Sequence, residues 1–301
     1  MSLFNTLVVK SLPLVPKSIV KSVASRYIAG AHLSDAVATV QRLDKLGARS
    51  TVDVLGEFVS SRERAVHECA ASSSVIDAIQ THNLPAYLSV KLTSLGLDID
   101  DSFCYANIRG LVEKAHNIGS FVRLDMENSP YTTRTLDIYR KIRAEGFTNI
   151  GVVIQAYMHR SEQDIRELAT LNADVRLCKG IYIEDSSIAF RERTEIQNNY
   201  KKLLRLLVEH NMNVHIATHD DVLIDDARDF IAKNNIAKDT YEFQMLLGVR
   251  EEKRDAIIKE GHGMRIYVPF GEDWYGYSTR RLKENPQVAG YVMKAMFTGG
   301  K

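Results

Sequence analysis

Residues 150–178 read IGVVIQAYMHRSEQDIRELATLNADVRLC, and this stretch decides the fold. It opens with a short, apolar run rich in β-branched residues, continues with a longer helical pattern, and closes with a second short apolar run. The pattern predicts a strand over Ile150–Ala156, a helix over Glu162–Leu171 and a second strand over Val175–Cys178. A strand, a helix and a second strand in this order are typical of a parallel sheet.

The same alternation extends in both directions along the chain. The other predicted strands are Ser50–Val54, Ala86–Leu92, Phe121–Asp125, Val214–Thr218, Glu242–Leu246 and Arg265–Val268. The other predicted helices are Ser34–Leu46, Gly56–Gln80, Ser102–His116, Tyr131–Arg143, Tyr200–His210, Val222–Lys233 and Glu251–Lys259. Eight strands that alternate with helices predict an α/β fold, a (β/α)8 TIM barrel. A doubly wound open sheet is the alternative, but its Gly-rich first turn is absent.

The composition fits a globular protein. The 301 residues include 39 Lys and Arg against 38 Asp and Glu, a net charge of +1, and 45% are hydrophobic. Such values exclude disorder and argue against nucleic-acid binding, which usually requires a basic excess. No apolar run reaches 18 residues, the length that a membrane span needs. The three cysteines, Cys69, Cys104 and Cys178, are far apart in the sequence, so we expect reduced thiols and a cytoplasmic protein.

The N-terminus differs from the rest of the chain. Its first 34 residues contain four basic residues and no acid, interleaved with apolar residues, which predicts basic amphipathic helices. We expect residues 1–47 to form a helical arm and residues 48–301 to form the barrel. The arm either packs on the barrel or contacts an anionic membrane surface, which would make the protein peripheral on the inner face of the cytoplasmic membrane.

Polar residues follow the predicted strands where a barrel carries its active site. They are Lys91, Thr93, Asp125, Glu127, Gln155, Tyr157, Lys179, Thr218, His219, Gln244 and Tyr267. Together they favour a functional cup of mixed charge. The spacing of His215 and His219 resembles that of metal ligands, but the pair lies on a strand without the H-E-x-x-H pattern, so we expect no metal site.

A charged stripe lies near the C-terminus. Tyr277, Arg280, Arg281 and Glu284 follow an i, i+3, i+4, i+7 spacing, which places them on one face of a helix. This face is either solvated, with internal ion pairs, or the inner face of a lid helix. The two arginines would then suit a substrate carboxylate.

Nine motifs in order along the chain carry a resemblance to a known family. They are Asp53-Val-Leu-Gly-Glu57, Leu88-Ser-Val-Lys91-Leu, Arg123-Leu-Asp125-Met126-Glu127, Val153-Ile-Gln155-Ala-Tyr157, Arg176-Leu-Cys-Lys179-Gly180, Ala217-Thr218-His219, Tyr241-Glu242-Phe-Gln-Met-Leu246, Arg265-Ile-Tyr267-Val-Pro269 and Tyr277-x-x-Arg280-Arg281-x-x-Glu284. With these motifs the sequence resembles the monofunctional proline dehydrogenases. The resemblance implies a distorted (β/α)8 barrel with the last helix over the barrel mouth.

The resemblance also implies an activity. It is the FAD-dependent oxidation of L-proline to 1-pyrroline-5-carboxylate, in which a hydride passes from C5 of proline to flavin N5 and the electrons pass on to a quinone. The product would then either diffuse away or be handed to a partner enzyme, pyrroline-5-carboxylate dehydrogenase, in a transient contact.

The family's substrate residues map onto this sequence as follows. Arg280 and Arg281 would bind the proline carboxylate with Lys91. Asp125 would pair with Lys91, and Glu284 would face the amine. The pocket walls would be Tyr267, Tyr277 and Leu246, and a tyrosine at position 267 goes with a preference for proline over hydroxyproline.

The cofactor residues follow in the same way. Arg176 would lie near flavin N5, where positive charge stabilises the reduced flavin. Asp125 and Arg176 are therefore the expected catalytic residues. The remaining expected FAD contacts are Met126, Gln155, Lys179, Gly180, Ile181, Thr218, His219 and Glu242.

Two other functions stay open. A barrel lyase or aldolase would use Lys91 or Lys179 as a Schiff-base amine. A proline-sensing binding module would bind the same ligand without turning it over.

Overall fold

The computed structural model describes residues 26–274, which form a closed barrel of eight parallel strands. The strands follow one another around the barrel in chain order, and β8 pairs with β1 to close it. Their bounds are β1 Arg49–Val54, β2 Ala86–Val90, β3 Val122–Leu124, β4 Ile150–Gln155, β5 Asp174–Cys178, β6 Val214–Ala217, β7 Tyr241–Leu246 and β8 Met264–Phe270. The predicted (β/α)8 barrel is confirmed.

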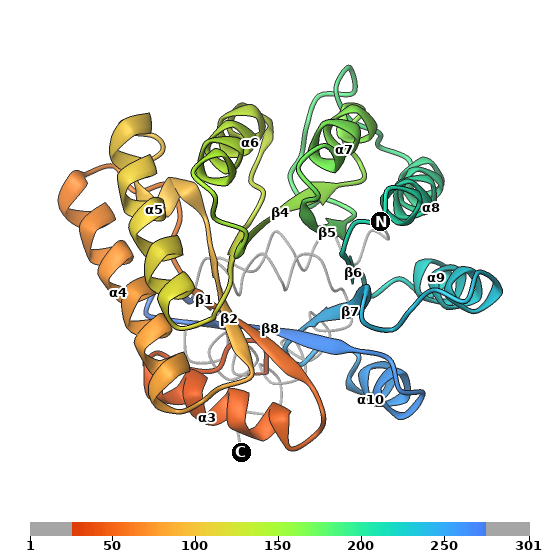
Figure 1. Ribbon diagram of the computed structural model, residues 1–301, viewed down its shortest axis with the longest axis horizontal. Coiled ribbons are helices and arrows are strands. Elements are labelled where there is room, and N and C mark those ends of the chain that lie inside the picture. Colours follow the sequence, from red (N-terminus) through yellow and green to blue (C-terminus); the bar gives the residue numbers. More distant parts are fainter. Residues whose placement is uncertain (1–25, 275–301) are drawn as a thin grey trace, which may run out of the picture.

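Helices form an outer ring around the strands (Figure 1). Their bounds are α3 Leu33–Asp44, α4 Arg62–Thr81, α5 Asp101–Asn117, α6 Ser129–Ala144, α7 Ser161–Ala169, α8 Arg193–Glu209, α9 Asp221–Lys233 and α10 Glu251–Lys259. A short 3-10 helix, η2 Leu92–Leu95, follows β2. Helix α3, which belongs to the predicted N-terminal arm, packs against β1 and β8. The helix expected over the barrel mouth, with Tyr277, Arg280, Arg281 and Glu284, lies outside the described residues, as does most of the arm.

The strands are largely buried on both faces. All six residues of β4 are buried, since outward side chains meet the helices and inward ones fill the barrel. Capping side chains define several helix starts: Ser61 accepts a hydrogen bond from Arg64 N at the start of α4, and Asp100 accepts one from Phe103 N at the start of α5.

Two predicted boundaries are wrong by more than a turn. Helix α8 begins at Arg193 rather than Tyr200, since its first two turns contain a single apolar residue, Ile196, beside polar ones such as Gln197, which donates to Asp220. Helix α4 begins at Arg62 rather than Gly56, because Ser61 caps it there.

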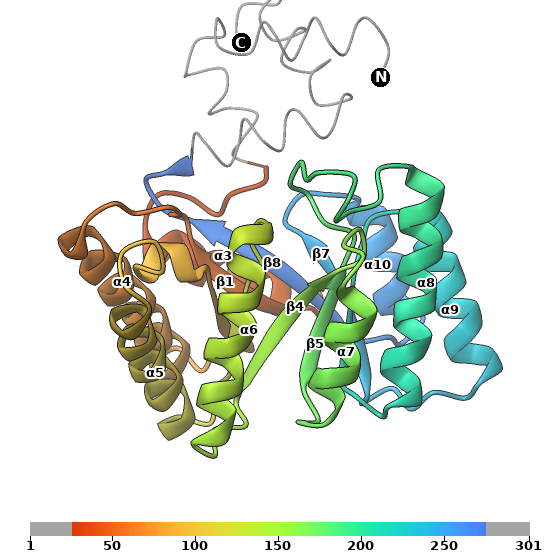
Figure 2. The ribbon, with the colours of Figure 1, turned by 90° about the horizontal axis from the view of Figure 1, so that it is seen from above.

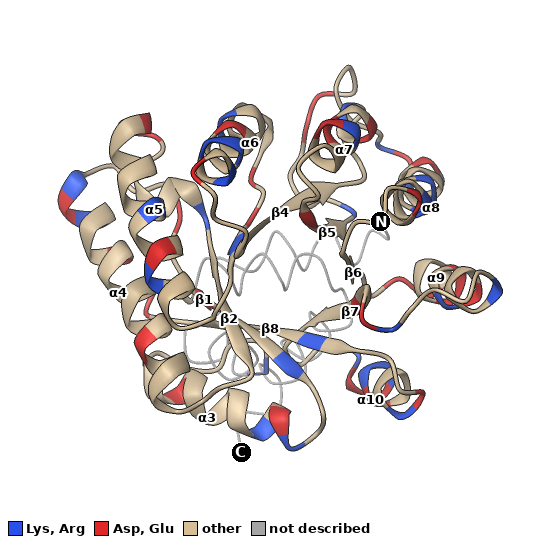
Figure 3. Ribbon diagram, viewed as in Figure 1, with Lys and Arg blue, Asp and Glu red and all other residues tan. Residues whose placement is uncertain are grey.

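Charged residues cover the outer faces of the helices, and a smaller number lie on the strands (Figure 3). Within residues 26–274, none of the helices has the length and apolarity required to cross a bilayer.

Candidate active site

A cavity of about 1400 Å³ opens at the carboxyl ends of the strands. Figure 2 shows the barrel from the side, with the arrowhead of β8 directed toward this end. Twelve of the predicted site residues line the cavity: Lys91, Asp125, Met126, Gln155, Arg176, Lys179, Gly180, Ile181, Thr218, His219, Leu246 and Tyr267. Strands far apart in the sequence therefore bring nearly all the described candidates together, as expected of parallel strands that end on one face.

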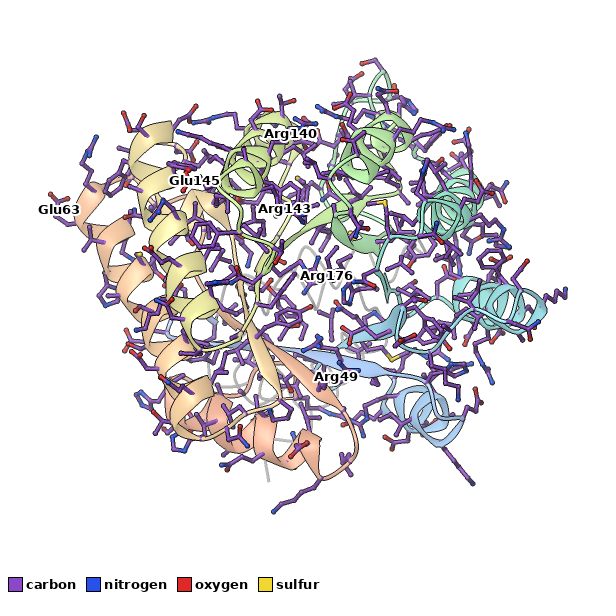
Figure 4. All side chains as sticks on the ribbon, viewed as in Figure 1. Arg49, Glu63, Arg140, Arg143, Glu145 and Arg176 are labelled. Carbon is purple, nitrogen blue, oxygen red and sulfur yellow. The ribbon has the colours of Figure 1, made fainter. Side chains whose placement is uncertain are left out.

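Asp125 and Arg176 form a buried ion pair at the centre of the barrel. Nη1 of Arg176 lies 2.7 Å from Oδ1 of Asp125. Ser89 Oγ donates to the same oxygen and the Tyr267 hydroxyl donates to Oδ2, each at 2.7 Å. Burial acts to raise the pKa of Asp125, but Arg176 and Lys91 outweigh it and the pKa is lowered. Asp125 is therefore an anion that accepts three hydrogen bonds. Figure 4 shows Arg176 inside the ring of strands.

Lys91 has a nearer partner than the sequence predicted. Its Nζ lies 3.1 Å from Oδ2 of Asp53 and 3.9 Å from Oδ2 of Asp125, so Asp53 is its principal partner. Adjacent strands explain this, because Asp53 of β1 is opposite Ser89 of β2, two residues before Lys91. Burial raises the pKa of Asp53 to about 6, although Lys91 opposes the shift. Burial disfavours the lysine cation, but Asp53 and Asp125 outweigh it and raise the pKa of Lys91.

The β3 loop contributes a second carboxylate behind this ion pair. Glu127 Oε2 accepts a hydrogen bond from Thr93 N at 3.1 Å, and Oε1 accepts one from Thr93 Oγ1. Burial raises the pKa of Glu127 to about 7. Neither Glu127 nor Thr93 lines the cavity. Their hydrogen bonds instead join the loop after β3 to the segment that follows β2.

The far end of the cavity carries exposed cations around a buried carboxylate. Asp220 accepts contacts from Lys179 at 3.3 Å and Arg193 at 3.2 Å, and its side chain is 1% exposed. Gln197 also donates to Asp220. Two cations held near the starts of α8 and α9 suit an anionic ligand such as a phosphate.

Gly180 allows the chain to turn beside Lys179. Its φ is +102°, and a Cβ there would lie 2.1 Å from Cδ1 of Tyr157. A residue with a side chain would therefore be strained and would clash. Nearby, Leu246 N donates to Nε2 of His219 at 2.9 Å, which places the ring proton on Nδ1.

Glu242 does not line the cavity, unlike the other described residues predicted to contact FAD. It lies in a buried charged layer below, which we define as Arg123, Asp174, His215, Glu242 and Arg265. Oε1 of Glu242 lies 2.6 Å from Nε of Arg265 and 2.8 Å from Nδ1 of His215. Its position in β7, two residues before Gln244, explains the difference: it lies one inward-facing residue deeper in the barrel.

The charged layer crosses the barrel interior. Arg123 of β3 pairs with Asp174 of β5, and Nε2 of His215 lies 2.7 Å from Oδ1 of Asp174. The intervening strand makes room for this crossing with Gly151, where a Cβ would lie 2.3 Å from Nη1 of Arg123. His215 thus has carboxylate partners inside the barrel, and residues 26–274 contain no group of three or more side chains arranged to hold a metal ion.

Several residues of the site were not predicted as such. Asp53 belongs to the first of the nine motifs and Gln244 lies at the end of a predicted strand, but the sequence predicted no role for either. Tyr27, Arg193 and Asp220 also line the cavity. The buried position of Asp53 among apolar residues of a strand was a usable signal, because a buried carboxylate requires a partner.

Comparison with known proteins identifies relatives over most of the chain. The family model described as Proline dehydrogenase matches residues 36–294. Proline dehydrogenase 2 of Bacillus subtilis (strain 168) is 39% identical over 273 residues, which cover 91% of this chain and 90% of that protein. Proline dehydrogenase of Deinococcus radiodurans is 33% identical over 282 residues, covering 92% and 91% of the two chains.

A solved structure has the same fold. Proline utilization A (PutA) from Bdellovibrio bacteriovorus, inactivated by N-propargylglycine, superposes with a TM-score of 0.81 at 26% identity. The match covers 88% of this chain and 32% of that one, so this chain spans about a third of the length of that protein.

Proposed function

The chain belongs to the proline dehydrogenase family and is an oxidoreductase that acts on proline; we propose that it converts L-proline to 1-pyrroline-5-carboxylate with FAD as cofactor and a quinone as electron acceptor. The observation that carries this proposal is the buried pair of Arg176 and Asp125 at the floor of a large cavity. Arg176 supplies a cation for the cofactor, and Lys91 beside the pair supplies a second cation for the substrate.

The cavity residues fit FAD. Arg176 lines the cavity and is held there by Asp125, so a fixed cation faces the space that a flavin would occupy. Lys179 and Arg193 lie at the far end of the cavity, where the cofactor's phosphates would be held. We assign Met126, Gln155, Gly180, Ile181, Thr218 and His219 to its remaining contacts. Bound FAD would accept a hydride from C5 of proline at flavin N5.

Lys91 would bind the proline carboxylate, together with Arg280 and Arg281 beyond the described residues. Tyr267 and Leu246 line the cavity and would contact the pyrrolidine ring. We assign Tyr277 and Glu284, also beyond the described residues, to the opposite wall and to the amine. Hydride loss from C5 requires a neutral amine, whose lone pair stabilises the developing iminium. Nearby cations favour that form because they lower the pKa of the bound amine.

The Schiff-base alternative is less well supported. A Schiff-base lysine must be neutral to attack a carbonyl, but Asp53 and Asp125 raise the pKa of Lys91 and keep it charged. Borohydride added with substrate would trap a covalent adduct if Lys91 or Lys179 acted in this way. A binding module would take up proline without consuming it.

The absorption spectrum of the purified protein tests the proposal. We expect flavin bands that L-proline bleaches under anaerobic conditions, and reoxidation by a soluble quinone. A protein that stays colourless after incubation with FAD would contradict the cofactor assignment. A flavoprotein whose bands proline does not bleach would contradict the reaction. The value of kcat/KM should also rise with pH below the pKa of the amine of free proline.

Transfer of electrons to a membrane quinone implies that a cytoplasmic protein visits the inner face of the membrane. We assign that contact to the basic residues of positions 1–34, and we expect the product to pass to a separate pyrroline-5-carboxylate dehydrogenase. Flotation with anionic vesicles, and its loss with neutral vesicles or high salt, would test the membrane contact.

A further inference from the structure

Gln244 lies between the cavity and the buried charged layer beneath it. The residue is 5% exposed and lines the cavity from β7. Its amide contacts Arg176 above and Glu242 and Tyr87 below. The side chain thus connects the cation assigned to the cofactor with side chains that no ligand in the cavity would reach.

The contacts below Gln244 fix the orientation of its amide. Nε2 lies 2.8 Å from Oε1 of Glu242 and 3.1 Å from the hydroxyl of Tyr87. Burial opposes ionisation of Glu242, but His215 and Arg265 outweigh it, and the pKa of Glu242 is well below its usual value. An ionised carboxylate can only accept hydrogen bonds. The nitrogen of the Gln244 amide must therefore face down, and its oxygen must face Arg176.

That oxygen holds one edge of the Arg176 guanidinium. Oε1 of Gln244 accepts a hydrogen bond from Nε of Arg176 at 2.6 Å. Asp125 holds a second edge through Nη1 at 2.7 Å. Because the guanidinium is planar, two contacts on different edges fix both its position and its plane. The guanidinium is then held in one orientation beside the cavity.

We propose that Gln244 is a positioning residue that fixes the plane of the Arg176 guanidinium beside the cavity, where the flavin would bind. The inference rests on the proposed function, since it requires FAD in the cavity. Gln244 acts through Arg176 and takes no part in the chemistry. The buried charged layer acts one step further away, because Glu242 determines which way the Gln244 amide points.

Glutamine suits this position better than its isosteres. A glutamate would place a second carboxylate against Glu242, since Nε2 of Gln244 lies only 2.8 Å from it. A methionine would keep the volume but could neither accept from Arg176 nor donate to Glu242. Gln244→Met therefore removes the positioning contacts with little change in packing.

The experiment compares Gln244→Met with Gln163→Met in the full-length holoenzyme. Gln163 also donates from Nε2 to a glutamate, Glu167, but on the exposed face of α7. We expect Gln244→Met to slow the anaerobic bleaching of FAD by L-proline at least about tenfold and to make the flavin midpoint potential more negative, because Arg176 stabilises the reduced flavin less well. The KM for proline should change less than about threefold, since Lys91 is untouched, and Gln163→Met should match the wild type.

A second comparison separates positioning from general damage. Lysine at position 176 has no planar guanidinium to orient, so adding Gln244→Met to Arg176→Lys should change the bleaching rate less than about twofold. Should Gln244→Met fail to fold, Gln244→Asn keeps an amide in the barrel but withdraws its oxygen by one methylene, and we expect the same loss.

Either of two results would overturn this inference and leave the proposed function intact. One is a wild-type bleaching rate and midpoint potential in the folded Gln244 variant. The other is a full tenfold effect that persists in the Arg176→Lys background. A wild-type protein that binds no FAD would instead overturn the proposed function, and the inference with it.

Discussion

The carboxylate of Asp53 lies 3.1 Å from the amino group of Lys91, and the two residues come from adjacent strands, β1 and β2. Lys91 is thus held over the cavity by a side chain that does not line it. This separation of a ligand-facing residue from its support allows each to be tested on its own.

Asp53→Asn should raise the KM for proline several-fold and change kcat less, because Lys91 keeps its charge but loses its principal partner. The pKa of Asp53 is about 6, so acidification through that value protonates the carboxylate and releases Lys91 in the same way. We therefore expect the wild-type kcat/KM to fall as the pH drops through about 6, and Asp53→Asn to lack this step. Asp44→Asn on α3 is the control. An unchanged KM with the acid step retained would show that Asp53 does not support Lys91.

Asp125→Asn should be far more damaging. The carboxylate accepts hydrogen bonds from Arg176, Ser89 and Tyr267, whereas an amide accepts through one oxygen and turns a donor toward the others. We expect kcat/KM to fall at least about 100-fold in steady-state assays at saturating FAD. Ser89→Ala removes one neutral donor and should lose at most about tenfold. Similar losses in the two variants would argue against an ionic role for Asp125.

Gly180→Ala tests the turn beside the cavity. Alanine at φ +102° is strained, and its Cβ would clash with Tyr157. Gly146→Ala is a matched control, because Gly146 has φ +95° but open space around its Cβ position. Calorimetry should show that Gly146→Ala lowers the free energy of unfolding by about 1 kcal/mol. Gly180→Ala should lose more, and fluorescence titration should show FAD affinity reduced at least about tenfold. Equal behaviour of the two variants would mean that Tyr157 moves aside freely.

His215 should make stability depend on pH. Burial lowers its pKa, but Asp174 and Glu242 outweigh burial and raise the pKa from 6.5 to about 9. A raised folded-state pKa gives a contribution that is full below about pH 6.5 and is lost as the pH rises through 9. The His215 contribution should fall by about 3 kcal/mol between pH 6.5 and 9.5, measured by urea unfolding as the difference between the wild type and His215→Gln. This difference separates it from the opposite contribution of Tyr87, whose pKa the neighbouring arginines lower to about 7. His82→Gln on the surface should keep the wild-type pH dependence. If His215→Gln kept the wild-type pH dependence of stability, that dependence would have to come from another titratable group.

The barrel was predictable because each of its strands and helices has a recognisable local sequence pattern. Each strand is a short β-branched run, and the predicted and observed bounds of β4, Ile150–Ala156 and Ile150–Gln155, differ by one residue. The start of α8 was missed because its first turns contain one apolar residue, Ile196, and because Gln197 there is held by Asp220, 23 positions away. Neither helix propensity nor the spacing of apolar residues can predict such a long-range contact.

The sequence was sufficient to predict which strand-end residues line the cavity, but not which of their side chains contact each other. Parallel strands bring their carboxyl ends together, which is why Lys91, Asp125 and Arg176 line one cavity. Which carboxylate meets which cation depends on register and closure. The pairs Asp53–Lys91 and Arg176–Gln244 are 38 and 68 residues apart in sequence, and their contacts follow from β1–β2 pairing and from the width of the closed barrel.

The charged layer below the cavity has a consequence for protein engineering. Buried ion pairs contribute little net stability, and well-packed apolar residues in their place often make a protein more heat-resistant. A library that varies all five residues of this layer together and is selected for thermostability alone should therefore enrich apolar residues at every one of them, since replacing the acids alone would leave Arg123 and Arg265 buried and unpaired. Such variants would gain melting temperature while losing the anion that orients Gln244. Selection for heat resistance in this barrel must consequently be coupled to an activity screen.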